Sequence, residues 1–315
     1  MIFRKLLAFG LVLNFIFLLS CSGGNSIEIE TEIMATTETA EMSTFPVRPE
    51  RLYDLEQVYD PTNDLKFDIY HPTKILYEKS PLLVAFHGGG WVAGDRSQIM
   101  YIFSPIVEEL REHGFAVATV QYRYAQDATF PAQLEDTVGA IRYMRDNAEK
   151  YNIDINSIGT MGYSAGAQLA MLAAYAVEGD FDIKYCIAFA GPSKLYGEEL
   201  SDYPDGIRYL LEWLFGGEYE EKEAEYMSGS PYYYIDAGTK KVPLMLVHDK
   251  RDDVVPFSQS QLMQKKFAEA NIPCELLALN GVYHQIDFTS PFMSSPSGEE
   301  ATRTIVDFVR KYAGK

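Results

Sequence analysis

The chain has 315 residues, of which 47% are hydrophobic, and a formal charge of −18 at pH 7. This length is enough for one large hydrophobic core. The strong negative charge argues against nucleic acids and acidic polymers as partners, because like charges repel.

The first residues have the pattern of a secretory signal. Arg4 and Lys5 precede an apolar stretch from Leu6 to Leu19, which is interrupted by Asn14. The stretch has 14 residues, whereas a membrane span needs roughly 17 to 25. It therefore fits the hydrophobic region of a signal peptide better than a transmembrane helix.

The motif LLSC at 18–21 resembles the lipobox of bacterial lipoproteins, in which the cysteine becomes the lipidated first residue after cleavage. We expect a signal peptide at 1–20 and a lipid on Cys21, with an ordinary signal peptide cut elsewhere as the alternative. Residues 21–50 have too few large apolar side chains to order themselves, so they are expected to form a flexible tether. The domain at 51–315 would then be exported and anchored to a membrane of a bacterial cell envelope.

Strand-like and helix-like segments alternate beyond residue 50. Apolar or alternating runs predict strands at 65–72, 81–86, 115–123, 157–164, 183–191, 242–249 and 274–279. Helical spacing of apolar residues predicts helices at 130–151, 165–177, 258–270 and 299–312. Strands that alternate with helices predict an α/β fold, in which helices cover both faces of a mostly parallel sheet.

The segment 192–241 interrupts this rhythm, because it is acidic and rich in tyrosine. Leu210, Leu211, Trp213 and Leu214 indicate one short amphipathic helix within it. We expect the segment to be a cap-like insertion above the sheet.

Four aromatic residues near the expected upper edge of the sheet are candidates for substrate binding: Trp91, Tyr163, Tyr232 and Tyr233. Aromatic rings stack well on sugar rings or on a feruloyl group. The alternative is that the tyrosines of the insertion only pack the core of the cap.

Cys186 and Cys274 lie in strand-like apolar segments. We expect both to be buried free thiols, since two core strands seldom offer the geometry of a disulfide.

GYSAG at 162–166 lies where a predicted strand passes into an alanine-rich helix. This is the G-x-S-x-G pattern of a nucleophile elbow, in which a tight turn raises the serine hydroxyl above the sheet. Ser164 is therefore the candidate nucleophile.

Three glycines follow His87 at the end of another predicted strand, in the run HGGGW. Acyl transfer produces an oxyanion, which needs preorganised N–H donors. The backbone N–H groups of Gly89 and Gly90, with that of Ala165 beside the nucleophile, are the candidate donors.

A nucleophilic serine needs a base, and the chain has 5 histidines. We expect structural roles for His71, His87 and His113, and His248 closes a strand. His284 lies in the loop after the last predicted strand, which leaves its ring free to reach the serine, so it is the candidate base.

The acid is expected between the serine and the histidine, because the order Ser, Asp, His is that of the α/β-hydrolases. The segment HDKRDDVVP offers Asp249, Asp252 and Asp253 for this role. The residue types alone do not show which of these three aspartates is the acid.

Several segments together resemble a known family: LKFDIYHP, HGGGWVAGD, GYSAGAQLA, SPYYY and DDVVPFSQS. They are similar to the α/β-hydrolase carboxylesterases of the hormone-sensitive-lipase-like and bacterial feruloyl/acetyl-esterase (BD-FAE-like) group, over about residues 50 to 313. The resemblance implies ester hydrolysis without a metal or cofactor. It places the nucleophile on Ser164, the base on His284, the acid on Asp252, and the oxyanion donors on the two glycines and Ala165 already named.

One departure from the family pattern concerns the acid, since Asp249 follows His248 where relatives usually have His-Gly.

The leading expectation is a serine carboxylesterase that acts on short-acyl or aromatic-acyl esters, including acetyl or feruloyl groups on glycans. An arylformamidase or a peptidase-type amide hydrolase is the second hypothesis. A non-catalytic binding protein with the hydrolase fold is the third.

Overall fold

The computed structural model describes residues 51–315 apart from residues 178, 180, 237, 291 and 294. The predicted signal peptide, the lipidation site Cys21 and the tether lie outside the described residues, so they stay predictions. Within the described ranges, no helix is both long enough and apolar enough to cross a membrane.

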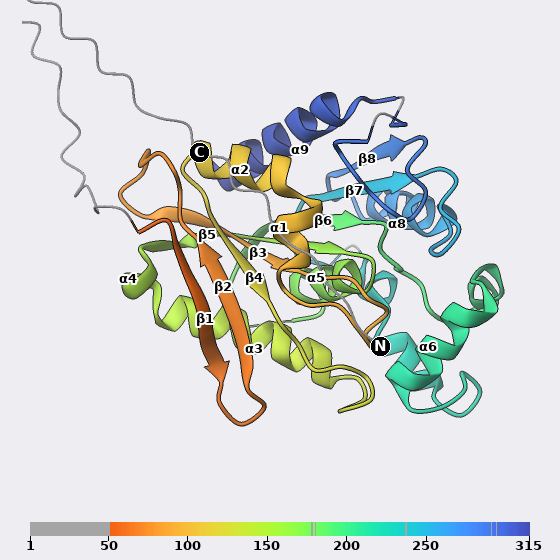
Figure 1. Ribbon diagram of the computed structural model, residues 1–315. Coiled ribbons are helices and arrows are strands. Elements are labelled where there is room, and N and C mark those ends of the chain that lie inside the picture. Colours follow the sequence, from red (N-terminus) through yellow and green to blue (C-terminus); the bar gives the residue numbers. More distant parts are fainter. Residues whose placement is uncertain (1–50, 178, 180, 237, 291, 294) are drawn as a thin grey trace, which may run out of the picture. The chain divides into compact units, whose positions relative to one another are not determined.

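An eight-stranded sheet forms the centre of the domain (Figure 1). Its spatial order is β1-β2-β4-β3-β5-β6-β7-β8, in which β2 pairs antiparallel with β1 and β4 and the remaining pairs are parallel. The strands are β1 (Tyr53–Asp60), β2 (Leu65–Tyr70), β3 (Ser80–Phe86), β4 (Ala116–Val120), β5 (Ile153–Tyr163), β6 (Ile183–Phe189), β7 (Leu244–Asp249) and β8 (Cys274–Leu279). This arrangement confirms the predicted α/β class with a mostly parallel sheet.

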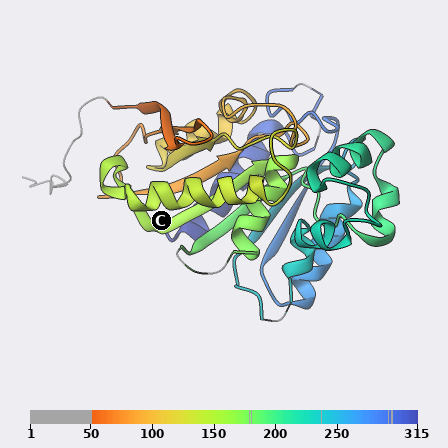
Figure 2. The ribbon, with the colours of Figure 1, turned by 90° about the horizontal axis from the view of Figure 1, so that it is seen from below.

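Helices cover both faces of the sheet (Figures 1 and 2). One face packs against α3 (Ala132–Asp146), α4 (Ala148–Tyr151), α5 (Ala165–Tyr175) and α8 (Ser258–Glu269). The other face packs against α1 (Gln98–Ile102), α2 (Ser104–Glu112) and α9 (Gly298–Ala313). The predicted helix at 130–151 is divided between α3 and α4.

Strand β3 shows why the central strands read as continuous apolar runs. Leu82, Val84 and Phe86 belong to one core, whereas Leu83 and Ala85 belong to the core on the opposite face. All five side chains are fully buried, because side chains alternate across a strand and both faces are covered.

Strand β1 was not predicted. Its apolar residues Tyr53, Leu55 and Val58 are 58%, 46% and 39% exposed. An edge strand that buries little of its apolar surface carries no clear alternating pattern in the sequence.

The insertion between β6 and β7 contains more than the single helix expected from its pattern. It comprises a 3₁₀ turn (Gly197–Asp202), α6 (Asp205–Phe215), α7 (Glu223–Ser228) and a second 3₁₀ turn (Pro231–Tyr234). Helix α6 buries Leu211, Leu214 and Phe215, which follow helical spacing. Trp213 lies outside this buried face, since it is 43% exposed and packs its ring against Tyr209.

The two cysteines of the sheet are free thiols. Cys186 in β6 is buried, and Cys274 at the start of β8 is half-buried. Burial raises the pKa of each thiol to about 12. Strand β7 lies between β6 and β8, which separates the two side chains by a whole strand.

Candidate active site

Ser164 lies at the sharp turn between β5 and α5, with φ 53° and ψ −118°. The turn leaves no room for side chains on the neighbouring glycines. A Cβ on Gly162 would lie 2.1 Å from the carbonyl oxygen of Gly166, and one on Gly166 would lie 2.2 Å from that of Phe86. The N–H of Ser164 donates to the carbonyl of Phe189 on β6 at 2.8 Å, which fixes the turn to the sheet. The strained conformation is typical of a nucleophile elbow.

Ser164, His284 and Asp252 form one hydrogen-bonded row. His284 Nε2 lies 3.0 Å from Ser164 Oγ, and His284 Nδ1 lies 2.8 Å from Asp252 Oδ2. Since a carboxylate only accepts, Nδ1 carries the ring proton and Nε2 is left to accept the serine O–H. The three groups are thus arranged for proton transfer from the serine to the imidazole.

The carboxylate of Asp252 is held in its ionised form. Its Oδ1 accepts the backbone N–H groups of Val254 at 2.9 Å and Val255 at 2.8 Å, and its side chain is fully buried. Burial by itself works to raise the pKa of Asp252. The hydrogen bonds from His248 and His284, followed by the charge of His284, outweigh it and hold that pKa well below its usual range.

The two neighbouring aspartates have other surroundings. Asp249 is buried and accepts the backbone N–H groups of Arg251 at 2.8 Å and Val282 at 2.9 Å. It therefore braces the turn after β7 against the loop that carries His284. Asp253 is exposed. Of the three carboxylates left open by the sequence, the structure brings Asp252 to the imidazole.

His248 is a second histidine on the same carboxylate, a role that the sequence reasoning missed. Its Nε2 lies 3.1 Å from Asp252 Oδ2 and 3.0 Å from the carbonyl oxygen of Val255, and its Nδ1 lies 2.8 Å from Ser260 Oγ. Both neighbours of Nε2 are acceptors, so Nε2 carries the proton and Nδ1 accepts from the serine hydroxyl. The only signal in the sequence was a histidine at the end of a buried strand, four residues before the acid.

The remaining histidines lie outside the triad, as expected. The His71 ring contacts Asp54 at 2.8 Å, and His113 Nδ1 lies 2.8 Å from the carbonyl of Glu109 in its own helix. His87 is fully buried, stacks on Tyr122 and donates from Nδ1 to the carbonyl of the next residue at 2.7 Å. Burial lowers the pKa of His87 to about 4, so a neutral ring supports the glycine loop.

The glycine loop after β3 lies at the cavity that contains the nucleophile. Gly89 and Gly90 have φ of +119° and +59°, a region that L side chains rarely adopt, and a Cβ on Gly89 would lie 2.0 Å from the carbonyl oxygen of Ala93. Within the described part of the chain, the N–H groups of Gly89, Gly90 and Ala165 donate to no acceptor. Gly89 and Gly90 line the same cavity as Ser164. These N–H groups are thus available to an oxyanion.

The cavity over Ser164 has a volume of about 440 Å³. Trp91 and Tyr163, two of the predicted substrate-binding residues, line it together with Leu210 of the insertion. Trp91 is held by a hydrogen bond from its Nε1 to Gln168 Oε1 at 3.0 Å. The hydroxyl of Tyr163 donates to the carbonyl of His284 at 2.6 Å.

The other two predicted substrate-binding residues, Tyr232 and Tyr233, do not line this cavity. The Tyr232 ring packs against the core, and the ammonium groups of Lys194 and Lys266 lie 5.4 Å and 5.0 Å from its centre. Tyr233 is 53% exposed. The second 3₁₀ turn directs these rings elsewhere, which the composition of the segment did not reveal.

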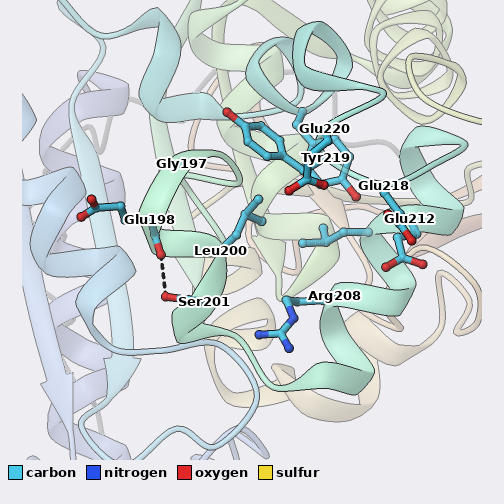
Figure 3. Close-up of a pocket in the computed structure, with 11 residues that line it drawn as sticks. Gly197, Glu198, Leu200, Ser201, Arg208, Glu212, Glu218, Tyr219 and Glu220 are labelled. Atoms are coloured by element: carbon cyan, nitrogen blue, oxygen red, sulfur yellow. Dashed lines mark hydrogen bonds between the residues drawn. The ribbon is translucent and has the colours of Figure 1, made fainter.

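A larger cavity of about 870 Å³ lies within the insertion (Figure 3). It shares no lining residue with the cavity over Ser164. Helix α6 separates the two, since Ile207 and Leu210 face the catalytic cavity whereas Arg208 and Leu211 face the other. Among the residues that the structure describes, no cluster of three or more His, Cys, Asp or Glu side chains is arranged to hold a metal ion.

Comparison with known proteins gives consistent matches. A family model described as BD-FAE matches residues 67–267. Versiconal hemiacetal acetate esterase of Dothistroma septosporum is 30% identical over 167 residues, which are 52% of this chain and 49% of that protein. The chain therefore spans about half the length of this curated relative.

Two solved structures have similar folds. A carbohydrate esterase from gut microbiota aligns with a TM-score of 0.70 and 22% identity, over 84% of this chain and 96% of that one. A bifunctional GH43-CE protein of Bacteroides eggerthii aligns with a TM-score of 0.70 and 26% identity, over 84% of this chain and 38% of that one. The first match supports the fold, and the second adds a modest similarity in sequence.

Proposed function

The chain belongs to the BD-FAE family, and we propose on this premise that it is a serine carboxylesterase that hydrolyses short-acyl or aromatic-acyl esters through an acyl-enzyme. The observation that carries the proposal is the row of hydrogen bonds from Ser164 through His284 to the buried Asp252. Free backbone N–H groups lie beside the serine in the same cavity. Nucleophile, base, orienting acid and oxyanion donors are the parts that acyl transfer requires.

In the first half of the reaction, Ser164 Oγ attacks the carbonyl carbon of the ester while its proton passes to His284 Nε2. The carbonyl oxygen becomes an oxyanion and accepts hydrogen bonds from Gly89, Gly90 and Ala165. Asp252 holds the imidazolium through Nδ1. These donors act on charge that develops only in the transition state, so they lower the barrier and not merely the dissociation constant.

The tetrahedral intermediate then loses the alcohol. The bond between the carbonyl carbon and the alcohol oxygen breaks, and His284 Nε2 gives its proton to that oxygen, which leaves an acyl group on Ser164. In the second half, His284 takes a proton from water, the hydroxide attacks the acyl carbon, and the bond to Ser164 Oγ breaks. The proton returns to the serine, and the carboxylic acid leaves.

Acyl groups carried on a carbohydrate are the substrate class that we propose. The fold shared with a carbohydrate esterase from gut microbiota and the similarity to the GH43-CE protein support this choice. Acetyl and feruloyl groups are the leading acyl candidates. A purely binding role is disfavoured, because all three triad members are present and joined by hydrogen bonds.

A panel of substrates tests the proposal against the amide-hydrolase hypothesis. It contains p-nitrophenyl acetate, butyrate and octanoate, acetylated xylo-oligosaccharides, methyl ferulate, N-formylkynurenine and dipeptide anilides. We expect esters with short or aromatic acyl groups to have the highest kcat/KM. The cavity over the serine is small, and the backbone N–H groups beside the serine suit the oxyanion of acyl transfer. The highest kcat/KM for N-formylkynurenine or for an anilide would contradict the esterase and favour amide hydrolysis.

A further inference from the structure

A second cavity adjoins the catalytic cavity on the side of His284. It has a volume of about 670 Å³ and is lined by residues of α1, the start of α2 and the loop after β8. The two cavities share Ile102, Tyr163 and Gln285 in their linings, so they lie side by side. We refer to the part lined by Tyr101, Ser104, Gln285, Asp287, Thr289 and Ser290 as the α1 groove.

The mechanism determines which part of an ester enters the α1 groove. The group that protonates the departing alcohol is His284 Nε2, and a proton donor must lie within about 3 Å of the oxygen that it protonates. The alcohol must therefore extend from Ser164 past His284. The loop that carries His284 continues directly into the wall of the groove, beginning with Gln285.

We propose that the α1 groove binds the alcohol portion of the ester, and that this alcohol is a polyhydroxylated sugar. This inference rests on the proposed esterase function. It adds that the sugar binds on the side of Ser164 where His284 lies. The acyl group would then occupy the opposite side of Ser164, against the insertion.

The chemistry of the two sides agrees with this division. Toward the insertion, the catalytic cavity is lined by the apolar side chains of Ile207, Leu210, Val254 and Val255. The cavity that contains the α1 groove has amide, hydroxyl and carboxylate groups in its lining, beside the apolar side chains of Ile102, Val282 and Ile286. Apolar walls suit an acyl chain, whereas groups that donate and accept hydrogen bonds suit the many hydroxyls of a sugar.

Tyr101 provides an aromatic surface at the edge of the α1 groove. Its side chain is 88% exposed and has no hydrogen bond or ring contact within the described part of the chain. The amide of Gln285 likewise has no partner among the described residues. A large aromatic ring left in solvent contributes nothing to the core, but it can stack on the apolar face of a sugar. The side chains of Tyr101 and Gln285 are therefore free to bind a ligand.

The cavity within the insertion is the competing location for a glycan (Figure 3). Tyr219 and Leu200 lie among Glu198, Glu212, Glu218 and Glu220 there, and Arg208 is the one basic residue in its lining. A sugar in this cavity would lie across α6 from Ser164. It could not also place its ester oxygen beside His284 without passing that helix.

Two esters with the same acyl group and different alcohols test the inference: ethyl acetate and an acetylated xylo-oligosaccharide. The measured quantity is the ratio of kcat/KM for the sugar ester to that for ethyl acetate. We expect Tyr101→Ala to lower this ratio about fivefold or more, mainly through a higher KM for the sugar ester, because truncation of an aromatic anchor weakens binding. Tyr219→Ala is the matched control and should leave both values of kcat/KM unchanged.

Product inhibition gives an independent measurement. The deacetylated xylo-oligosaccharide should inhibit wild-type hydrolysis of ethyl acetate competitively, and Tyr101→Ala should weaken that inhibition about fivefold or more.

Three results would overturn the inference. They are an unchanged ratio in folded Tyr101→Ala, an equal loss on both esters, and a selective loss in Tyr219→Ala. In each case normal hydrolysis of ethyl acetate by the wild type would leave the proposed esterase intact. Failure of the wild type to hydrolyse either ester would overturn the esterase as well.

Discussion

Replacing Ser164 by alanine is expected to reduce kcat for p-nitrophenyl acetate by a factor on the order of 10⁶, because members of a triad act as a unit. The change removes the atom that attacks the carbonyl, and His284 then has no hydroxyl to deprotonate. Steady-state kinetics on purified protein would measure the loss. Circular dichroism would show whether the variant keeps the fold of the wild type.

Ser201→Ala is a suitable control for this substitution, since Ser201 is an exposed serine of the insertion whose hydroxyl donates only to the carbonyl of Glu198. It should retain wild-type kcat. Unchanged turnover in a folded Ser164→Ala protein would refute serine catalysis at this position.

Replacing Asp252 by asparagine is expected to lower kcat by roughly 10⁴ if the geometry survives. The neutral amide no longer stabilises the imidazolium, and its NH₂ group can face Nδ1 and select the wrong tautomer of His284. Because Asp252 also accepts from His248 and from two backbone N–H groups, the free energy of unfolding should fall as well. Kinetics and chemical denaturation on the same preparation would separate the two effects.

The neighbouring aspartates serve as controls with different expected results. Asp253→Asn should retain both activity and stability, since Asp253 is exposed. Asp249→Asn should lower the free energy of unfolding by about 1 to 3 kcal/mol, because an NH₂ group replaces one of the two buried oxygens that accept backbone N–H groups. Its folded fraction should keep kcat within a few-fold of the wild type. An active Asp252→Asn protein beside an inactive Asp253→Asn protein would show that the acid has been misassigned.

The nucleophile and the glycine loop could be predicted from the sequence because the backbone itself is constrained there. Gly162 and Gly166 flank the serine because a Cβ at either position would collide with backbone atoms. Gly89 and Gly90 have positive φ, a region that L side chains rarely adopt. Such positions demand glycine, so they leave a pattern that can be recognised without a structure.

The parts that could not be predicted depend on which distant segments meet. The α1 groove joins α1 to the loop after β8, and no local pattern in either segment indicates that they share a cavity. His248 contacts the acid only because the turn after β7 folds the carboxylate back onto the strand. Tyr232 and Tyr233 suit a substrate site by residue type, but they lie in the second 3₁₀ turn of the insertion and do not line the cavity over Ser164.

The most direct measurement is identification of the residue that is covalently modified by diethyl p-nitrophenyl phosphate, an organophosphate that reacts with activated serines. We expect one equivalent of p-nitrophenol to be released as activity is lost, and mass spectrometry should locate the diethylphosphoryl group on Ser164. Ser164→Ala should release no such equivalent. Complete inactivation with the group on any other residue, or full ester hydrolysis by a protein whose Ser164 is modified, would contradict catalysis through an acyl-enzyme on this serine.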